Sequence, residues 1–260
     1  MAPLAEDSYP LPVTTTALEQ SIDDAWRVFG SHRVTHPVAV CAHCTTDRAL
    51  EAMVRTPVRE WPDHLVAEHE FAVAVAAIDF DVDSSDDRFV DQQRAVLPRY
   101  LRYLANGHGS DATMAPYGAL RYRERWNDGE VAALDDFYRA LIRDSVDDRD
   151  GAVHIALSGG ASSDLAISEI DRLPEKDAAD AIAEMLPTLI YAHGSPHFTI
   201  FSEVGTCRLE ADRMRDWLLA PVQRRRIETA IDVATVAGDD RRYQRLWRGL
   251  LVQQAAGQDR

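Results

Sequence analysis

Lysine is almost absent from this chain, because Lys176 is the only lysine among 260 residues. A mechanism that needs a Schiff-base or phosphate-binding lysine therefore has one candidate, which lies at a polar helix start. Long apolar runs are also absent, since none approaches the roughly 18 residues of a membrane span. The segment from Met1 to Pro12 lacks the basic and apolar regions of a secretion signal. We expect a cytoplasmic protein with no membrane partner.

Cysteine is scarce as well, with Cys41, Cys44 and Cys207 as the only three. An odd number of cysteines in a reducing compartment argues against a framework of structural disulfides. No serine occupies the Gly-x-Ser-x-Gly pattern of a nucleophile elbow. The sequence therefore shows no complete set of catalytic residues.

Positive charge is in short supply. The 28 Lys and Arg residues stand against 43 Asp and Glu residues, which gives a formal charge of -15 and a pI near 4.9. This charge opposes contact with nucleic acid or an anionic membrane, so neither is an expected partner. An acidic helical surface instead favours electrostatic pairing with a basic protein partner.

Helix signals extend over nearly the whole chain. After a threonine that can cap a helix at position 15 or 16, apolar residues recur at helical spacing at Leu18, Ile22, Trp26 and Phe29. Similar spacing, interrupted by proline or glycine, predicts helices over 45–56, 62–78, 89–105, 112–126, 130–146, 164–173, 174–192, 209–220, 222–237 and 239–256. The sequence thus predicts an all-α fold, an irregular array of about ten helices with little or no β structure.

The domain organisation is expected to be simple. Residues 1–14 are predicted to be disordered or extended, and 15–256 to form one helical domain, either single or built of two lobes that meet near 147–151. Two segments do not fit one pattern. Residues 151–160 are compatible with a strand or a short helix, and 197–204 alternate weakly like a strand.

A glycine pair follows the first of these segments. The run Ser158-Gly159-Gly160-Ala161-Ser162-Ser163 resembles the phosphate-binding S-G-G-x-D-S loop of ATP pyrophosphatases, with Ser162 where that family has an acid. That resemblance implies a strand before the glycines. The alternative is that the glycine pair ends one helix before Ser162 or Ser163 caps the next.

Soft, reactive side chains gather in one place, where the thirteen residues from 32 to 44 contain His32, His36, Cys41, His43 and Cys44. The C-x-x-C spacing lets two thiolates meet one zinc ion, so Cys41, Cys44, His43 and His36 are the candidate metal ligands. More distant ligands are available in His193, His197 and Cys207.

Two other interpretations of this cluster stay open. Cys41 and Cys44 precede a predicted helix, whose N-terminus favours a thiolate, so they also suit a redox pair; the βαβ context of a thioredoxin-like site is missing. The third interpretation, which we favour, is that small thiols simply pack at a helix junction. No cofactor is expected on that basis, and zinc is the one that the cluster suits.

Three segments carry a resemblance to known proteins: Val40-Cys41-Ala42-His43-Cys44, Met53-Val54-Arg55-Thr56-Pro57-Val58-Arg59-Glu60 and Leu97-Pro98-Arg99-Tyr100-Leu101. Together they resemble a family of uncharacterised bacterial all-helical proteins, in which a C-x-x-C precedes an L-x-R-T-P-x-R-E segment and a later L-P-R-Y-L helix. The resemblance covers mainly residues 35 to 145, and this chain departs from it at Met53 and Val54, where leucine is usual. It implies an all-α fold and no particular activity.

The expected function follows from what is present and what is missing. An acidic helical chain without a complete catalytic set is best interpreted as a protein-protein interaction module rather than an enzyme. The alternative is a zinc- or thiol-dependent enzyme centred on Cys41 and Cys44.

Overall fold

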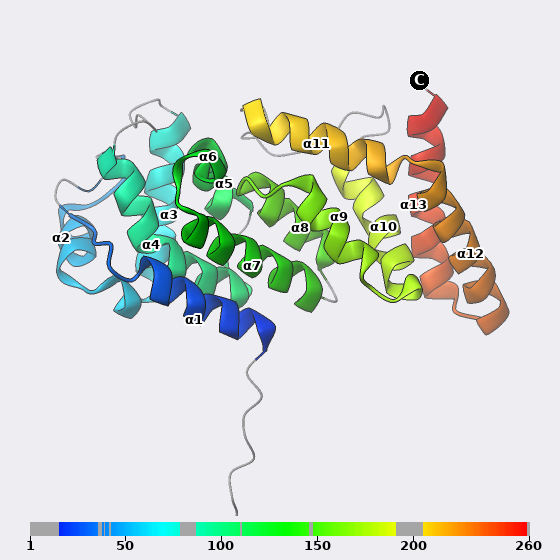
Figure 1. The fold of residues 1–260 in the computed structure, drawn as a ribbon, viewed down its shortest axis with the longest axis horizontal. Helices are drawn as coiled ribbons and strands as arrows, with labels where there is room; N and C mark the ends of the chain where they lie inside the picture. Colours follow the sequence, from blue (N-terminus) through cyan, green and yellow to red (C-terminus); the bar gives the residue numbers. More distant parts are fainter. Residues whose placement is uncertain are drawn as a thin grey trace, which may run out of the picture.

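The structure is a computed structural model, and the residues it describes are 16–35, 38, 40–41, 43–78, 87–109, 111–145, 148–190 and 205–258. In these residues the chain forms thirteen α-helices and one short 3-10 helix, η1 (Figure 1). The all-α prediction is therefore confirmed. No helix in the described ranges combines the length and the apolar character that a bilayer span requires.

The helices follow one another with short connections. Their bounds are α1 Ala17–Phe29, α2 Asp47–Arg55, η1 Val58–Glu60, α3 Asp63–Ile78, α4 Asp87–Ala105, α5 Asp111–Ala119, α6 Tyr122–Arg125, α7 Asp128–Asp144, α8 Arg149–Ser158, α9 Ser163–Asp171, α10 Glu175–Leu189, α11 Gly205–Leu218, α12 Pro221–Ala237 and α13 Asp240–Gln258.

The first two helices begin where local chemistry places them. The side chain of Thr16 accepts a hydrogen bond from the backbone N–H of Glu19, and that of Thr46 accepts one from Ala49, so each threonine satisfies an N–H that has no partner within its helix. The buried face of α1 includes Ile22 and Phe29, as its spacing predicts.

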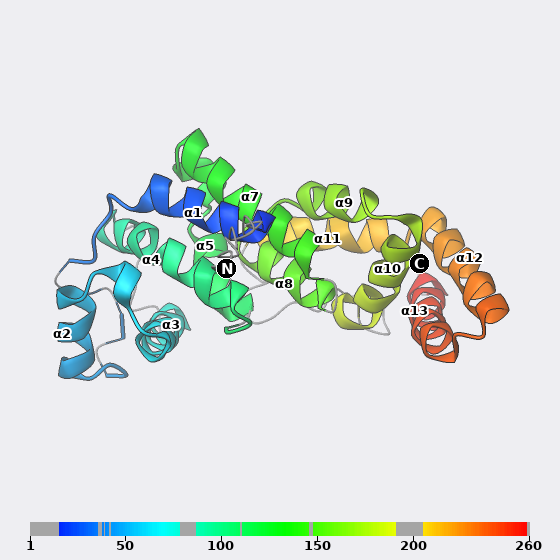
Figure 2. The same cartoon turned by 90° about the horizontal axis from the view of Figure 1, so that it is seen from below.

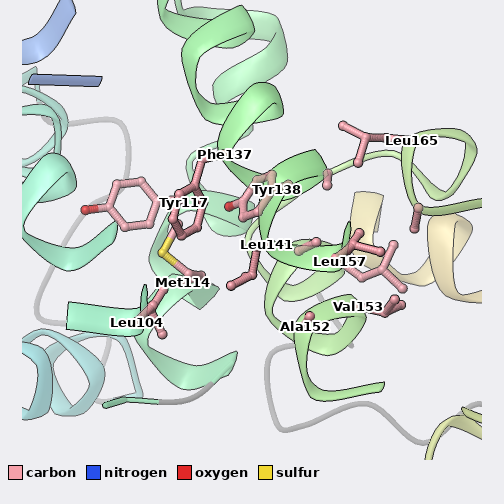
Figure 3. Packing of buried hydrophobic residues seen from close by; sticks show 14 of the residues in the cluster. Leu104, Met114, Tyr117, Phe137, Tyr138, Leu141, Ala152, Val153, Leu157 and Leu165 are labelled. Atoms are coloured by element: carbon pink, nitrogen blue, oxygen red, sulfur yellow. The ribbon is translucent and has the colours of Figure 1, made fainter. Parts of the chain in front are cut away.

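The helices form an elongated array, with α2 near one end and α12 and α13 at the other (Figures 1 and 2). Helix α1 packs against α4 and α7, α5 packs against α8, and α10 packs against α12 and α13. One contiguous cluster of buried apolar side chains runs from α1 to α13. Figure 3 shows part of it, in which Tyr117 of α5, Tyr138 of α7, Leu157 of α8 and Leu165 of α9 are among the buried side chains.

Two segments account for the helices beyond the ten or so that the spacing indicates. Residues 149–158 form α8, so the segment that was compatible with either a strand or a short helix is a helix. The helix expected over 112–126 is instead broken into α5 and α6, because Arg121 adopts a left-handed conformation with φ 50° and ψ 52°. That conformation interrupts the helical hydrogen bonding, and helix spacing alone does not reveal it.

The glycine pair works as a helix end. Gly160 has φ +88°, which favours glycine, and a Cβ atom on Gly159 would lie 2.0 Å from the hydroxyl oxygen of Tyr138. Ser162 then accepts a hydrogen bond from the N–H of Leu165 and caps α9. Because a helix and not a strand precedes the glycines, the phosphate-loop interpretation is wrong and the capping interpretation is confirmed.

Several expectations lie outside the described residues. These are the N-terminal segment 1–14, His36, and the weakly alternating segment 197–204. The boundary expected near 147–151 falls partly on residues 146 and 147, which are also outside, so a division into two lobes there stays a prediction.

Candidate functional site

The cysteine pair lies in the turn that leads into α2. The sulfur atoms of Cys41 and Cys44 are 3.1 Å apart and share a hydrogen bond. Cys41 is buried, whereas Cys44 is half-buried. The N–H of Cys41 donates to the carbonyl oxygen of Ala72 in α3, and the N–H of Cys44 donates to the carbonyl oxygen of Cys41. The structure thus brings together the two residues of the C-x-x-C motif.

The histidines of the same cluster do not all join the pair. His43 is exposed, and His32 places its Nε2 atom 3.4 Å from a carboxylate oxygen of Glu130 in α7. Within the described part of the chain, no three His, Cys, Asp or Glu side chains group closely enough to hold a metal ion. His36 lies outside that part, as do His193, His197 and the side chain of Cys207, so zinc binding stays a prediction.

A second site lies between α1, η1 and α4, and sequence reasoning missed it. It is a hollow of about 310 Å³ whose lining includes three arginines and two tryptophans together with two acids and an amide: Arg59, Arg99, Arg102, Trp26, Trp61, Asp23, Glu60 and Asn106. Helix α1 contributes Trp26, which is half-buried and packs against the core on the face that it shares with Ile22 and Phe29. Three arginines in one hollow are notable in a chain whose formal charge is -15.

Arg99 forms the floor of this hollow. It is 8% exposed, its Nε–H donates to the carbonyl oxygen of Trp61 at 2.8 Å, and its Nη2 donates to Asp63 at 2.5 Å. The third nitrogen, Nη1, is buried and has no hydrogen-bond partner. A buried donor without an acceptor is unusual, because its desolvation is not compensated.

The other two arginines differ in how far they are neutralised. Arg102 donates to Glu19 at 2.8 Å and lies 3.8 Å from Asp23. Arg59 is exposed, makes no ion pair with any described residue, and places its guanidinium 5.6 Å from the centre of the Trp26 ring. Its charge is therefore held by a cation-π contact and is open to an anion.

The acid next to Arg99 responds to it electrostatically. The hydrogen bond from Arg99 lowers the pKa of Asp63, with further lowering by the charges of Arg99 and His108. Asp63 thus stays ionised and holds one edge of the Arg99 guanidinium in place, while the Nη1 nitrogen faces no acceptor.

A buried histidine packs against Trp61, next to the first hollow. The ring of His69 lies 5.4 Å from that of Trp61, and its Nδ1 atom is 2.7 Å from the hydroxyl oxygen of Tyr100. Complete burial lowers the pKa of His69 from 6.5 to about 3, so the ring is neutral at physiological pH. The neutral ring and its partners fix Trp61, whose carbonyl oxygen accepts from Arg99.

A second hollow of about 400 Å³ adjoins the first and shares Trp26 and Arg59 with it. Its walls include Pro57, Val58 and Ala95, so it is more apolar than the first hollow. We refer to the two hollows together as the binding groove. The first hollow is lined mainly by charged side chains, and the second combines apolar side chains with Arg33, Arg59 and His32.

The first hollow of the groove is lined mainly by charged side chains and two tryptophans. It includes the carboxylates of Asp23 and Glu60, and the second hollow includes His32, so groups of the kind that act as general bases are present as well. Arginine and tryptophan are among the side chains that contribute most to binding energy at protein interfaces.

Two motifs in the sequence point to this place once the fold is known. Arg59 and Glu60 belong to the R-T-P-x-R-E segment, and Arg99 stands in the middle of Leu97-Pro98-Arg99-Tyr100-Leu101, whose other four residues are buried. An arginine inside such an apolar helical segment indicates a charged side chain that is buried and held by specific partners. What joins the two motifs is the packing of η1 against α4.

Comparison with family models, with curated proteins and with solved structures gives no match for this chain.

Proposed function

We propose that this protein works by binding another protein, and that the binding groove receives a partner segment in which a carboxylate side chain adjoins an apolar one. The main support is the charge of Arg59, which is exposed in the first hollow without an ion pair to any described residue, beside Arg99, whose buried Nη1 nitrogen has no acceptor. A carboxylate in the hollow pairs with the exposed guanidinium of Arg59 and places negative charge beside that of Arg99.

The charge balance favours a carboxylate over a phosphate group. Arg99 is paired with Asp63 and Arg102 with Glu19, so Arg59 is the one arginine of the first hollow without an ion pair to any described residue. A carboxylate carries a single negative charge, whereas a phosphate group on a side chain carries about 1.5 to 2 at neutral pH. The second phosphate charge would face Asp23 and Glu60 without compensation.

The length of the groove favours a protein segment over a compact metabolite. The two hollows meet at Trp26 and Arg59, and the second presents Pro57 and Val58 to an apolar side chain. A chain that crosses both hollows therefore meets guanidinium donors and apolar surface in succession. The formal charge of -15 of the whole chain suits a partner that is basic around this segment.

A binding measurement with short labelled peptides tests the proposal. Peptides of alternating leucine and glutamate, leucine and glutamine, or leucine and phosphoserine differ only in the group offered to the hollow. We expect the glutamate peptide to bind most tightly by fluorescence anisotropy. Arg59→Gln should weaken it about fivefold, equivalent to about 1 kcal/mol for an exposed charge pair.

The matched control is Arg55→Gln. Arg55 is an exposed arginine of the same segment, pairs with Glu51 on α2 and does not line the groove. Its replacement should leave the affinity unchanged. Equal binding of the glutamine peptide, tighter binding of the phosphoserine peptide, or equal losses in the two arginine variants would contradict the proposal.

A further inference from the structure

The turn before α2 holds two thiols at a distance that is short for a non-bonded contact. The sulfur atoms of Cys41 and Cys44 are 3.1 Å apart, and a disulfide bond requires about 2.0 Å. An approach of about 1 Å therefore converts the contact into a bond. Side-chain rotation and small backbone shifts in one turn are sufficient for a movement of that size.

The backbone holds the turn in this shape. The N–H of Cys41 donates to the carbonyl oxygen of Ala72 at 3.1 Å, which ties the turn to α3. The carbonyl oxygen of Cys41 accepts from the N–H of Cys44 at 3.2 Å and from the hydroxyl of Thr45 at 3.0 Å. Because so short a loop is already closed, bond formation adds little entropy loss.

The two thiols differ in their access to solvent. Cys41 is 3% exposed, whereas Cys44 is half-buried and follows the exposed His43. A reagent in solution therefore reaches Cys44 first, and Cys41 lies behind it within contact distance. This is the order of an attacking thiol and a resolving thiol.

We infer that Cys41 and Cys44 are a thiol-disulfide exchange site whose substrates are low-molecular-weight disulfides. The Cys44 thiolate attacks one sulfur of the small disulfide, forms a mixed disulfide and releases one thiol. The Cys41 thiolate then attacks the Cys44 sulfur and releases the second thiol. The two protein thiols are oxidised to one disulfide, and the small disulfide is reduced to two thiols that carry the two protons.

This site is independent of the binding groove. None of its atoms lines either hollow, so loss of peptide binding does not affect it and loss of thiol exchange does not affect the groove. It also differs from a zinc site in its requirement, since it needs two sulfur atoms and no third ligand.

A redox titration of the full-length chain tests the inference. The Cys207→Ser variant leaves Cys41 and Cys44 as the only cysteines. It is equilibrated in buffers of increasing oxidised to reduced glutathione, quenched and analysed by peptide mass spectrometry. We expect an internal 41–44 disulfide to form and to disappear again on reduction, with no glutathione adduct left at equilibrium.

Single replacements then separate the roles of the two thiols. Cys41→Ser should accumulate a stable glutathione adduct on Cys44, and Cys44→Ser should form an adduct on Cys41 roughly tenfold more slowly, because access limits the buried thiol. Circular dichroism of each variant checks that the fold is retained. Persistent adducts on the intact pair, no disulfide under oxidising ratios, or stoichiometric zinc that protects both thiols would overturn the inference.

Discussion

His69 should make the stability of this protein fall steeply in mild acid. Its ring is fully buried, and burial lowers its pKa from 6.5 to about 3. In the unfolded chain the imidazole takes up a proton below about pH 6.5, whereas in the folded chain it does so only near pH 3. The stability that the neutral ring supplies is thus fully present above the unfolded pKa and is lost as the pH falls.

The size of the effect follows from the gap between the two pKa values. Each unit is worth about 1.36 kcal/mol, so at about pH 5 the loss from this residue is about 2 kcal/mol. The folded protein cannot easily accept a second proton on the His69 ring. The Nε2 atom of His69 is 3.0 Å from the amide nitrogen of Gln92 and the Nδ1 atom faces Tyr100, so a second ring proton meets a donor.

Urea denaturation at about pH 7.5 and about pH 5 measures this loss. The wild type is compared with His69→Gln, which does not titrate, and with His64→Gln on the exposed face of the same helix. Other groups, such as Asp63, also weaken folding in acid, but they contribute equally to all three proteins and cancel. We expect His69→Gln to lose about 2 kcal/mol less than the other two between these pH values. Equal losses in the three proteins would refute the assignment of a neutral buried ring.

Two further stability predictions concern local geometry. Gly160→Ala should lower the unfolding free energy by about 1–3 kcal/mol, because φ is +88° and the Cα atom of Gly118 lies 3.1 Å from the new Cβ atom. In the control Gly107→Ala, φ is +77° but the new Cβ atom meets nothing within 4 Å, so the loss should be smaller. Equal losses by thermal denaturation would show that only backbone strain matters. Thr46→Ala should lower the unfolding free energy by about 1 kcal/mol, because the hydrogen bond that caps α2 is lost. Thr46→Ser keeps a hydroxyl at this position and should retain most of that free energy. A serine variant as unstable as the alanine variant would show that the hydroxyl does not stabilise α2.

Local signals predicted the helices well because the causes of those helices are local. The caps at Thr16 and Thr46 and the left-handed turn at Gly160 depend on residues a few positions away. The break at Arg121 was not predictable in this way, since arginine has no intrinsic preference for a positive φ. Arg121 itself is exposed, whereas its neighbours Leu120 and Tyr122 are both buried in the core, and helix spacing does not reveal that the chain must turn between them.

The candidate sites show the same division. The C-x-x-C spacing correctly indicated that Cys41 and Cys44 meet, because a turn joins them. The spacing of α1 put Trp26 on one face with Ile22 and Phe29, and the structure packs it half-buried against the core, where it also lines the groove. The groove itself depends on α1, η1 and α4, and no periodicity indicates that Arg59 and Arg99 line one hollow.

The most direct test of the account is a titration of arginine-labelled protein followed by NMR of the side-chain Nε–H groups. The Nε–H of Arg99 is buried and bonded to Trp61, so its signal is protected from exchange with water. The account predicts that the leucine-glutamate peptide shifts the signals of Arg99 and Arg59, while that of Arg55 stays in place. A shift at Arg55 alone, or no shift at Arg99 when the peptide is bound, would contradict the claim that the groove receives a carboxylate.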